Sequence, residues 1–410
     1  MSRTALAWRS LWRNRRRTLI TLCAMSLSLM LVQAFHNLSS GVYSRMIDSG
    51  VRAGTGHIAL YREGYPEARS EALLFDPQDL PKRLRKQPGV EAALPRLYLP
   101  ALAQSSRESR GVLMLGVDAR FEPAVNPYLK DLPEDALLRP GQPRDAVLGQ
   151  RLMEELRLKE GQKFVVSLQN RSSELASELF RVRGRMKTGI PEVDAGTLMV
   201  NLESAARLSG SSEGIHELAL VLDGESRLKT MLPVVRHLAR ELPGVEVLDW
   251  EQAMPNLANA IRLDNASQKF IFAIILAIVG IGVVNSLLMS VMERIREFGL
   301  ILALGTSPRH LRCLVLLEAG LLGLLSALLG SALGALATWY LVVRGIDLRA
   351  FISESIEVGG VVFEPVLRAT WDLPAMAASA LFMVLLCLAA GLYPARKAAR
   401  TPPAEAMRHV

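Results

Sequence analysis

Long runs without charged side chains stand out against the otherwise mixed pattern of hydrophobic and polar positions. No Asp, Glu, Lys or Arg occurs in residues 18–35, 270–292, 319–343 or 373–395. A helix needs about 20 apolar residues to cross a hydrocarbon core of roughly 30 Å. The pattern therefore predicts four transmembrane helices, at residues 18–36, 270–292, 313–343 and 373–393.

The block between the first two runs, residues 37–269, contains no comparable run and predicts a large soluble domain. Residues 147–166 indicate a strand, a helix and a second strand after a turn at Gly161. Strands are also expected at 218–222 and 245–248, around a helix at 228–242. Residues 171–174 are expected to form a loop, and residues 184–196 a hairpin or exposed loop. The fold class is a four-helix membrane protein with a large inserted α+β domain. The alternation of strands and helices without strict βαβ order suggests two small subdomains in this domain.

A short charged segment, residues 293–312, separates the second and third runs. Within it Ile295, Phe298 and Leu302 recur at near-helical spacing, and Gly305 supplies a helix stop. The segment predicts a short amphipathic helix that a soluble partner can bind.

Basic residues give the orientation of the chain. Arginine and lysine are concentrated in residues 1–17, 293–312 and 394–410, and the positive-inside rule assigns all three, with both termini, to the cytoplasm. Residues 37–269 and the loop 344–372 are then extracytoplasmic. The net charge of +8 follows from this topology and does not indicate nucleic-acid binding. The alternative is that the first run is a cleaved signal peptide ending near Ala34.

Candidate chemistry is sparse. The histidines lack metal-ligand spacing, the three cysteines lie in or beside the apolar runs, and no G-x-S-x-G or P-loop motif occurs. We therefore expect no catalytic residue, metal site or cofactor site, and no ATP binding by this chain. Glu318 is expected to have a structural role near the cytoplasmic interface, where its carboxylate either pairs with another residue or extends to the interface.

Small residues recur in the third run at a spacing that lets helices approach closely in lipid. This pattern does not decide between contacts within one subunit and a dimer interface. The positions are Gly323, Ser326, Ala327, Gly330 and Gly334.

Residues 293–334 (ERIREFGLILALGTSPRHLRC onward) resemble the core signature of FtsX-like permeases, the membrane subunits of MacB and lipoprotein-releasing (type VII) ABC transporters. Residues 6–21 and 393–408 are similar to the start and the terminal motif of that family, and residues 147–164 and 180–208 are similar to its periplasmic domain. The resemblance covers nearly the whole chain.

This resemblance implies a bacterial inner-membrane permease in a homodimer or a heterodimer with a second permease. ATP and Mg would bind a separate P-loop ATPase subunit, and a periplasmic adaptor or lipoprotein carrier is a further partner. The outer domain would be of Porter and Sabre type, with the Porter part at 50–130 and 215–255 and the Sabre part at 131–214.

The segment after the second span would then be a coupling helix that contacts the ATPase. The charged residues of this segment are expected to make polar contacts with the ATPase, and Phe298 and Leu302 to anchor the helix in it. Gly299 would permit a close approach of the two proteins, and Gly305 would end the helix. The proposed coupling residues are Glu293, Arg294, Arg296, Glu297, Phe298, Gly299, Leu302 and Gly305.

Three functions remain open at this point. The first is an ABC permease that converts ATP hydrolysis into movement of its outer domain, for release or export of lipoprotein or other lipidated cargo. The second is a non-transporting signal transmitter that activates a periplasmic hydrolase, and the third is a sensor of membrane-active peptides.

The topology can be tested with reporter fusions. Fusions at Arg3, Thr306 and Val410 should report a cytoplasmic location, and a fusion at Ser172 an extracytoplasmic one, because of the arginine distribution. A cytoplasmic signal at Ser172 would contradict the predicted architecture.

Overall fold

The structure is a computed structural model, and it divides into two compact units that we describe separately. Unit 1 comprises Met1–Tyr43, Leu263–Phe351 and Pro365–Val410; unit 2 comprises Ser44–Arg262 and Ile352–Glu364. The structure describes residues 3–130, 132–211, 214–224, 227–348, 357–358, 361–362 and 366–400. Parts of the predicted loop 344–372 and of the predicted tail 394–410 thus lie outside the described residues.

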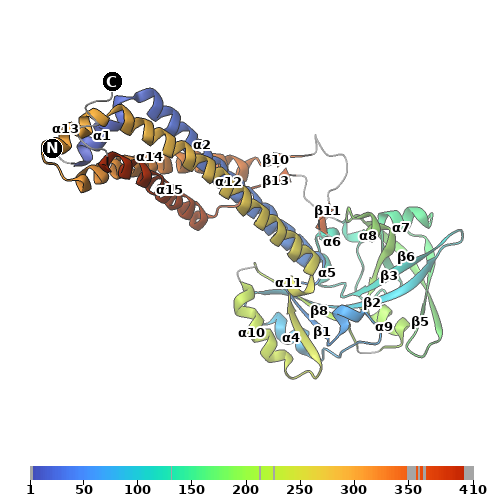
Figure 1. The fold of residues 1–410 in the computed structure, drawn as a ribbon. Helices are drawn as coiled ribbons and strands as arrows, with labels where there is room; N and C mark the ends of the chain where they lie inside the picture. Colours follow the sequence, from blue (N-terminus) through green and yellow to red (C-terminus); the bar gives the residue numbers. More distant parts are fainter. Residues whose placement is uncertain are drawn as a thin grey trace. The chain divides into compact units, whose positions relative to one another are not determined.

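Unit 1 is built from long helices (Figure 1). Within the described residues, four helices are long and apolar enough to cross a membrane: α2 (Arg15–Ala53), α12 (Pro255–Glu293), α14 (Pro308–Val343) and α15 (Leu373–Arg400). The shorter helices are α1 (Arg3–Arg13) and α13 (Ile295–Ala303). Two short strands, β10 (Ile346–Asp347) and β13 (Val366–Leu367), pair antiparallel.

The helices are longer than the apolar runs that predicted them. Helices α2 and α12 each have 39 residues, and both continue through polar sequence beyond the predicted spans 18–36 and 270–292. Helix α15 continues to Arg400 with Pro394 inside it, although the predicted span ended at residue 393. Hydropathy marks the part of a helix that lipid can surround, whereas the helix itself ends only where the backbone bonding stops.

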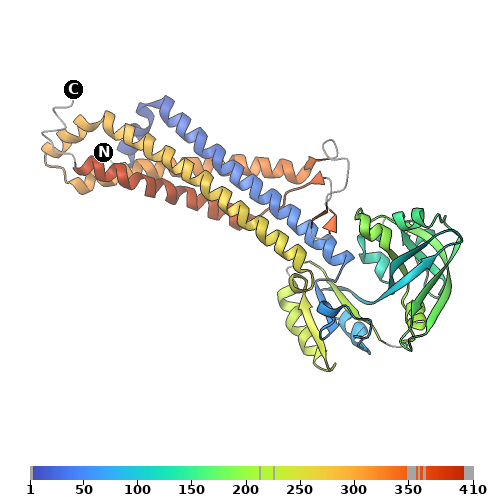
Figure 2. The same ribbon diagram turned by 45° about the vertical axis from the view of Figure 1, so that its right-hand side comes forward.

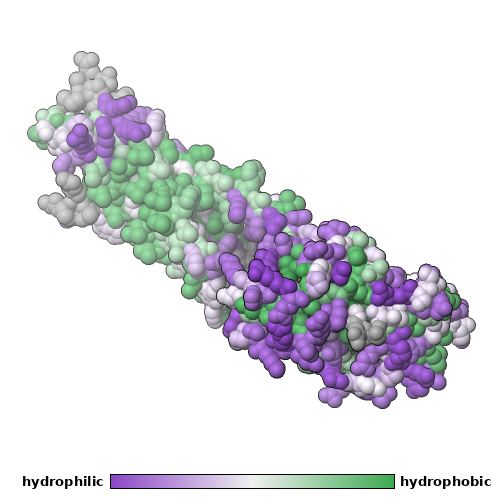
Figure 3. Space-filling model, turned by 90° about the horizontal axis from the view of Figure 1, so that it is seen from below, coloured by the Kyte–Doolittle hydropathy of each residue, from purple (hydrophilic) through white to green (hydrophobic). Residues whose placement is uncertain are grey.

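The surface of unit 1 is largely hydrophobic. Figure 3 shows green, hydrophobic residues covering the helical part of the molecule, with hydrophilic residues gathered at the end that carries α1 and α13. Large apolar side chains are exposed along all four long helices, for example Ile20, Ile278, Leu328 and Leu381. A continuous apolar surface of this kind is stable in hydrocarbon and would aggregate in water.

Unit 2 is built around one nine-stranded mixed sheet, in the order β3-β7-β4-β6-β5-β2-β8-β1-β9. Its strands are β1 (Ile58–Arg62), β2 (Val90–Gln104), β3 (Ser109–Val117), β4 (Asp145–Gly149), β5 (Lys163–Gln169), β6 (Leu175–Met186), β7 (Thr197–Asn201), β8 (Glu217–Leu222) and β9 (Val245–Asp249). Its helices are α3 (Tyr65–Ala68), α4 (Leu80–Arg85), α5 (Glu122–Val125), α6 (Pro127–Lys130), α7 (Gln150–Glu155), α8 (Pro191–Gly196), α9 (Leu202–Ser209), α10 (Leu228–Ala239) and α11 (Trp250–Ala253), with a 3-10 turn at Glu134–Ala136. Two further short strands, β11 (Glu357–Val358) and β12 (Val361–Val362), pair with each other.

Unit 2 has two main hydrophobic cores, and they divide differently from the predicted Porter and Sabre parts. One core joins β2 and β3 to β4–β7 through residues such as Leu97, Met114 and Phe180. The other core lies under β1, β8, α4 and α10 and includes Leu60 and Val235. Because β2 contributes to both, the predicted boundary at residue 131 does not separate the cores. The Porter and Sabre assignment stays a prediction.

Local elements were predicted well where turn residues bounded them. The order β4, α7 and β5 matches the prediction for residues 147–166, and Gly161 has a φ of 82° at the expected turn. The prediction for residues 184–196 was wrong, because β6 extends to Met186 and α8 occupies Pro191–Gly196. The buried Asp194 carboxylate organises this segment, since it accepts hydrogen bonds from Thr188 N at 2.7 Å and Thr188 Oγ1 at 2.8 Å.

A buried ionic cluster crosses the sheet of unit 2. Arg96 on β2 is 1% exposed and lies 2.7 Å from Glu122 and 3.2 Å from Glu217. The Tyr61 hydroxyl donates to Glu217 at 2.8 Å. Burial raises the pKa of Glu217, while the Arg96 cation opposes that shift. Because removal of one partner would leave a buried charge unpaired, this cluster strongly favours a single packing of these strands.

Two buried histidines of unit 2 are held in their neutral form by backbone donors. His216 Nδ1 accepts a hydrogen bond from Tyr98 N at 3.0 Å, and His57 Nδ1 accepts one from Leu222 N at 3.1 Å. Protonation of Nδ1 would place two N–H groups against each other. Burial lowers the pKa of each imidazole to about 4.

These histidines predict that unit 2 loses stability as the pH falls. A histidine with an unfolded pKa near 6.5 and a folded pKa of about 4 binds more protons when unfolded, so its contribution is lost between these two values. For His216 alone we expect a loss of about 2 kcal/mol between pH 7 and pH 5. The free energy of unfolding, followed by tryptophan fluorescence, should depend less steeply on pH for His216→Gln than for the unmodified chain. For the exposed control His237→Gln, the pH dependence should equal that of the unmodified chain. Equal slopes for both variants would contradict this interpretation.

Candidate functional site

The segment between the second and third membrane helices forms a short, sharply bounded helix. Helix α12 ends at Glu293, Arg294 is not helical, and α13 begins at Ile295 and ends at Ala303. Gly305 has a φ of 91°, a conformation that favours glycine, and Pro308 then starts α14. The observed helix occupies only part of the charged segment 293–312, and it ends just before Gly305, the residue that was expected to stop it.

One face of α13 is buried in the chain's own core. Phe298 is 2% exposed and packs in a cluster with Val291, Leu311, Val315, Ala395 and Ala398. Gly299 is buried beside it, and Leu302 is half-buried against the same cluster. In this chain the Phe298 side chain joins α13 to α12, α14 and α15, and its predicted contact with an ATPase stays a prediction. Helical spacing shows which residues share a face, but it does not show what covers that face.

Ion pairs link the charged residues of this segment to other helices. Glu293 lies 2.8 Å from Arg17 at the start of α2, and Glu297 lies 2.6 Å from Arg13 on α1. The hydrogen bond from Arg13 lowers the pKa of Glu297. Figure 1 shows α1 and α13 at the same end of the helical unit. The acidic residues of the segment thus contact the basic amino-terminal region, a pairing that the sequence alone did not indicate.

Arg294 occupies the centre of this network. Its guanidinium lies 2.7 Å from Glu318 on α14 and 3.4 Å from Glu297, and 4.9 Å from the centre of the Phe298 ring. Glu318 is 3% exposed. Of the two arrangements expected for Glu318, the structure shows the ion pair, with Arg294 as its partner.

The opposite face of α13 is exposed and includes two leucines. Leu300 is 57% exposed and Leu304, directly after the helix, is 79% exposed. Arg296 is also exposed. Exposed leucines outside the long apolar runs are suited to contact with a protein partner. Sequence analysis missed Leu300, although its position opposite Phe298 on the helix was available as a signal.

The small residues of α14 make close contacts within this chain. A Cβ atom added to Gly323 would lie 2.8 Å from the Cβ atom of Cys387 on α15, and one added to Gly330 would lie 2.9 Å from the Cβ atom of Leu29 on α2. Gly334 contacts Gln33 of α2. Ser326 and Ala327 are buried in the same part of the bundle. The stripe therefore packs α14 between α2 and α15, which the sequence had left open.

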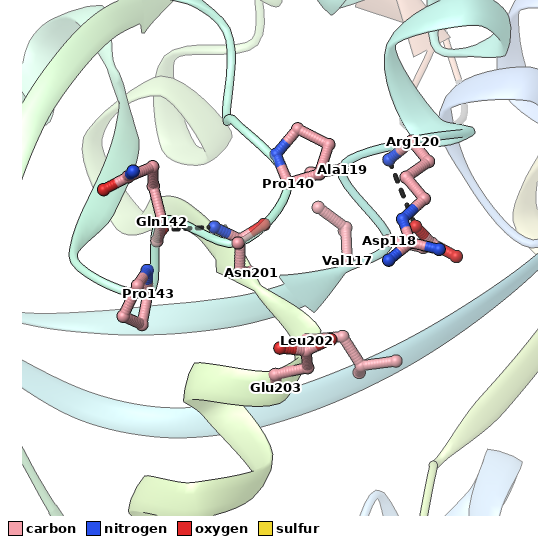
Figure 4. Close-up of a pocket in the computed structure, with 11 residues that line it drawn as sticks. Val117, Asp118, Ala119, Arg120, Pro140, Gln142, Pro143, Asn201, Leu202 and Glu203 are labelled. Atoms are coloured by element: carbon pink, nitrogen blue, oxygen red, sulfur yellow. Dashed lines mark hydrogen bonds between the residues drawn. The ribbon is translucent and has the colours of Figure 1, made fainter.

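The soluble unit contains a small pocket of about 170 Å³ (Figure 4). Its polar groups mostly bond to neighbouring loops: Asn201 Nδ2 donates to Gln142 O at 2.7 Å, and Asp118 Oδ1 accepts from Arg120 N at 3.1 Å. Within the described residues, no group of three or more His, Cys, Asp or Glu side chains is placed to hold a metal ion. The pocket thus offers no arrangement that indicates a reaction, and α13 is the stronger candidate site.

These features define a membrane protein with four long apolar helices, a soluble α+β unit and a short interhelical segment. The family model described as MacB-like periplasmic core domain matches residues 18–232, and the model described as FtsX-like permease C-terminal matches residues 269–403. The chain therefore belongs to the FtsX-like permeases with a MacB-like periplasmic core domain, the permease components of ABC transporters of the LolC and MacB type.

Curated relatives agree with this family. The lipoprotein-releasing system transmembrane protein LolC of Neisseria meningitidis is 27% identical over 332 residues, which cover 78% of this chain and 79% of that protein. The macrolide export ATP-binding/permease protein MacB of Burkholderia cenocepacia is 25% identical over 387 residues, covering 87% of this chain and 54% of that protein. Among solved structures, the periplasmic region of MacB from Actinobacillus actinomycetemcomitans matches with a TM-score of 0.36 and 12% identity, covering 50% of this chain and 94% of that chain.

The buried position of Phe298 predicts a large effect on stability. Phe298→Ala should destabilise the helical unit by about 3–5 kcal/mol, because the truncation leaves a cavity where four helices meet. Thermal unfolding of the purified chain in detergent measures this loss. The control is Leu300→Ala on the exposed face of the same helix, which should change the unfolding temperature little. Similar unfolding temperatures for Phe298→Ala and the unmodified chain would contradict the assignment.

Proposed function

We propose that this permease uses α13 to couple ATP hydrolysis by a partner ATPase to movement of its soluble unit. The observation that carries this proposal is the pair of exposed leucines outside the long apolar runs, Leu300 on α13 and Leu304 directly after it. Apolar side chains of this size are typical anchors when they enter a pocket of a partner. ATP and Mg bind the ATPase in this proposal, since the printed sequence contains no P-loop motif.

The interactions behind α13 make it suitable for transmitting movement. Phe298 fixes the buried face, and the ion pairs of Glu293, Arg294 and Glu297 tie the segment to α1, α2 and α14. A force on the exposed leucines therefore acts on several membrane helices together. A loop without these contacts would absorb such a force by bending.

Long continuous helices support the second half of the proposal. Helices α2 and α12 each have 39 residues and contribute residues to both units. A hydrogen-bonded helix resists bending, so displacement at one end is carried along its axis. In the bundle itself, the buried amide nitrogens of Gln33 and Asn37 donate hydrogen bonds to Met376 O on α15 and Thr338 Oγ1 on α14, which tie α2 to both helices.

The proposed cargo is a lipoprotein or another lipidated molecule, with a second permease completing a dimer in the inner membrane. The support is the similarity to LolC proteins, whose name states a lipoprotein-releasing system. The broad apolar surface of α12 and α14 offers lipid-facing contacts for acyl chains. A periplasmic adaptor or carrier would receive the cargo.

The coupling proposal can be tested at the two leucines. Leu300→Glu combined with Leu304→Glu should weaken ATPase binding, because each change places a charge in an apolar contact. A loss of about 2 kcal/mol at each anchor would weaken the affinity by roughly a thousandfold. Co-purification of the ATPase and its turnover stimulated by an acylated lipopeptide are the measurements.

The matched control for this test is Leu175→Glu, because Leu175 on β6 is 79% exposed, as Leu304 is. This control should leave ATPase binding and stimulated turnover unchanged. Full binding and turnover in the double variant, with normal thermal stability, would contradict docking at α13. Equal stimulation by an unacylated peptide would contradict a lipidated cargo.

A further inference from the structure

A surface cavity of about 500 Å³ lies between the start of α2 and the last turns of α12. These two helices run antiparallel and side by side (Figure 2), as the hydrogen bond between Thr21 Oγ1 and Ser286 Oγ at 3.0 Å shows. Arg16, Arg17 and Asn285 supply polar groups to the cavity, and Ile20 and Met289 supply apolar ones. We propose that this cavity binds the headgroup of an anionic phospholipid.

The charge of the cavity favours a phosphate. Arg16 is exposed and makes no ion pair with any residue that the structure describes, whereas Arg17 pairs with Glu293 at 2.8 Å. The cavity therefore presents one uncompensated guanidinium beside a second, partly neutralised one. Guanidinium groups match phosphate oxygens with paired N–H donors. Basic pockets between membrane helices are known to bind anionic headgroups at this level.

The depth of the cavity matches the headgroup region. Arg16 and Arg17 directly precede the uncharged run 18–35, and Asn285 and Met289 lie in the last turns before Glu293. Both helices thus change from apolar to charged sequence at the same place. A phosphate held here would keep its acyl chains within the apolar zone.

Asn285 gives an independent reason for a polar occupant. Its side chain is exposed within the uncharged run 270–292 of α12, where the neighbouring exposed residues, such as Ile278 and Ile281, are apolar. An amide facing hydrocarbon without a hydrogen-bond partner costs free energy. A headgroup phosphate or glycerol oxygen in the cavity would satisfy it.

Apolar contacts for the acyl chains lie along the same surface. Ile20 is 71% exposed and Met289 is 56% exposed. At Gly282, an added Cβ atom would meet nothing within 4 Å, so the helix leaves open space there. The lipid proposal does not depend on ATPase docking at α13.

The test uses native mass spectrometry of the full chain in detergent, titrated with phosphatidylglycerol, cardiolipin or phosphatidylcholine. The unmodified chain should retain the anionic lipids and lose phosphatidylcholine. Arg16→Gln should weaken retention of the anionic lipids by about fivefold, as expected for loss of one cation near a membrane surface. Arg15→Gln removes the same charge one residue away, outside the cavity lining, and should retain them fully.

A second variant tests the polar contact separately from charge. Asn285→Leu should also weaken retention of the anionic lipids, without loss of folding, because its side chain is exposed. Inorganic phosphate at millimolar concentration should not displace the lipid, since it lacks acyl chains. Displacement by phosphate would overturn the lipid assignment.

Two further outcomes would overturn the proposal. Equal losses for Arg16→Gln and Arg15→Gln would show a general attraction of basic residues for anionic lipid. A change in the permease dimer or in bound ATPase for Arg16→Gln, with unchanged lipid retention, would show that a protein covers the cavity.

Discussion

The ion pair between Arg294 and Glu318 is the interaction on which the arrangement around α13 depends. Glu318 is 3% exposed near the end of a membrane helix, where an unpaired carboxylate would be very unfavourable. Its partner Arg294 is the residue at which the chain leaves α12 and enters α13. The pairing of this buried charge thus holds the turn between α12 and α13 against α14, beside the cluster that contains Phe298.

The two faces of α13 have separate roles because of this arrangement. The buried face, with Phe298 and Gly299, determines stability, whereas the exposed face, with Leu300 and Leu304, is available to a partner. Substitutions on the two faces should therefore separate folding from coupling. A charge change at Glu297 would affect both folding and coupling, because it also removes the ion pair with Arg13.

The sequence was sufficient to predict the membrane helices and several elements of the soluble unit. Each apolar run lies in a helix that is long and apolar enough to cross a membrane, and turn residues such as Gly161 bound the local elements. Long-range pairings could not be predicted. Arg96 lies in a largely apolar strand, and its partners Glu122 and Glu217 are 26 and 121 residues away in sequence. The contacts of Phe298 within the helical unit could not be predicted for the same reason, because periodicity does not identify the surface that a helix face meets.

The amino-terminal arginines show how one set of charges can serve several functions. They indicate orientation by their number, but in the structure Arg13 and Arg17 pair with the acidic residues that flank and enter α13. The start of α2 and the end of α12 are thereby held together at the point where the proposed phosphate would bind. A headgroup that competes with Glu293 for Arg17 would weaken the ion pair between these two residues. The composition of the surrounding lipid would therefore affect the stability of the contacts around α13.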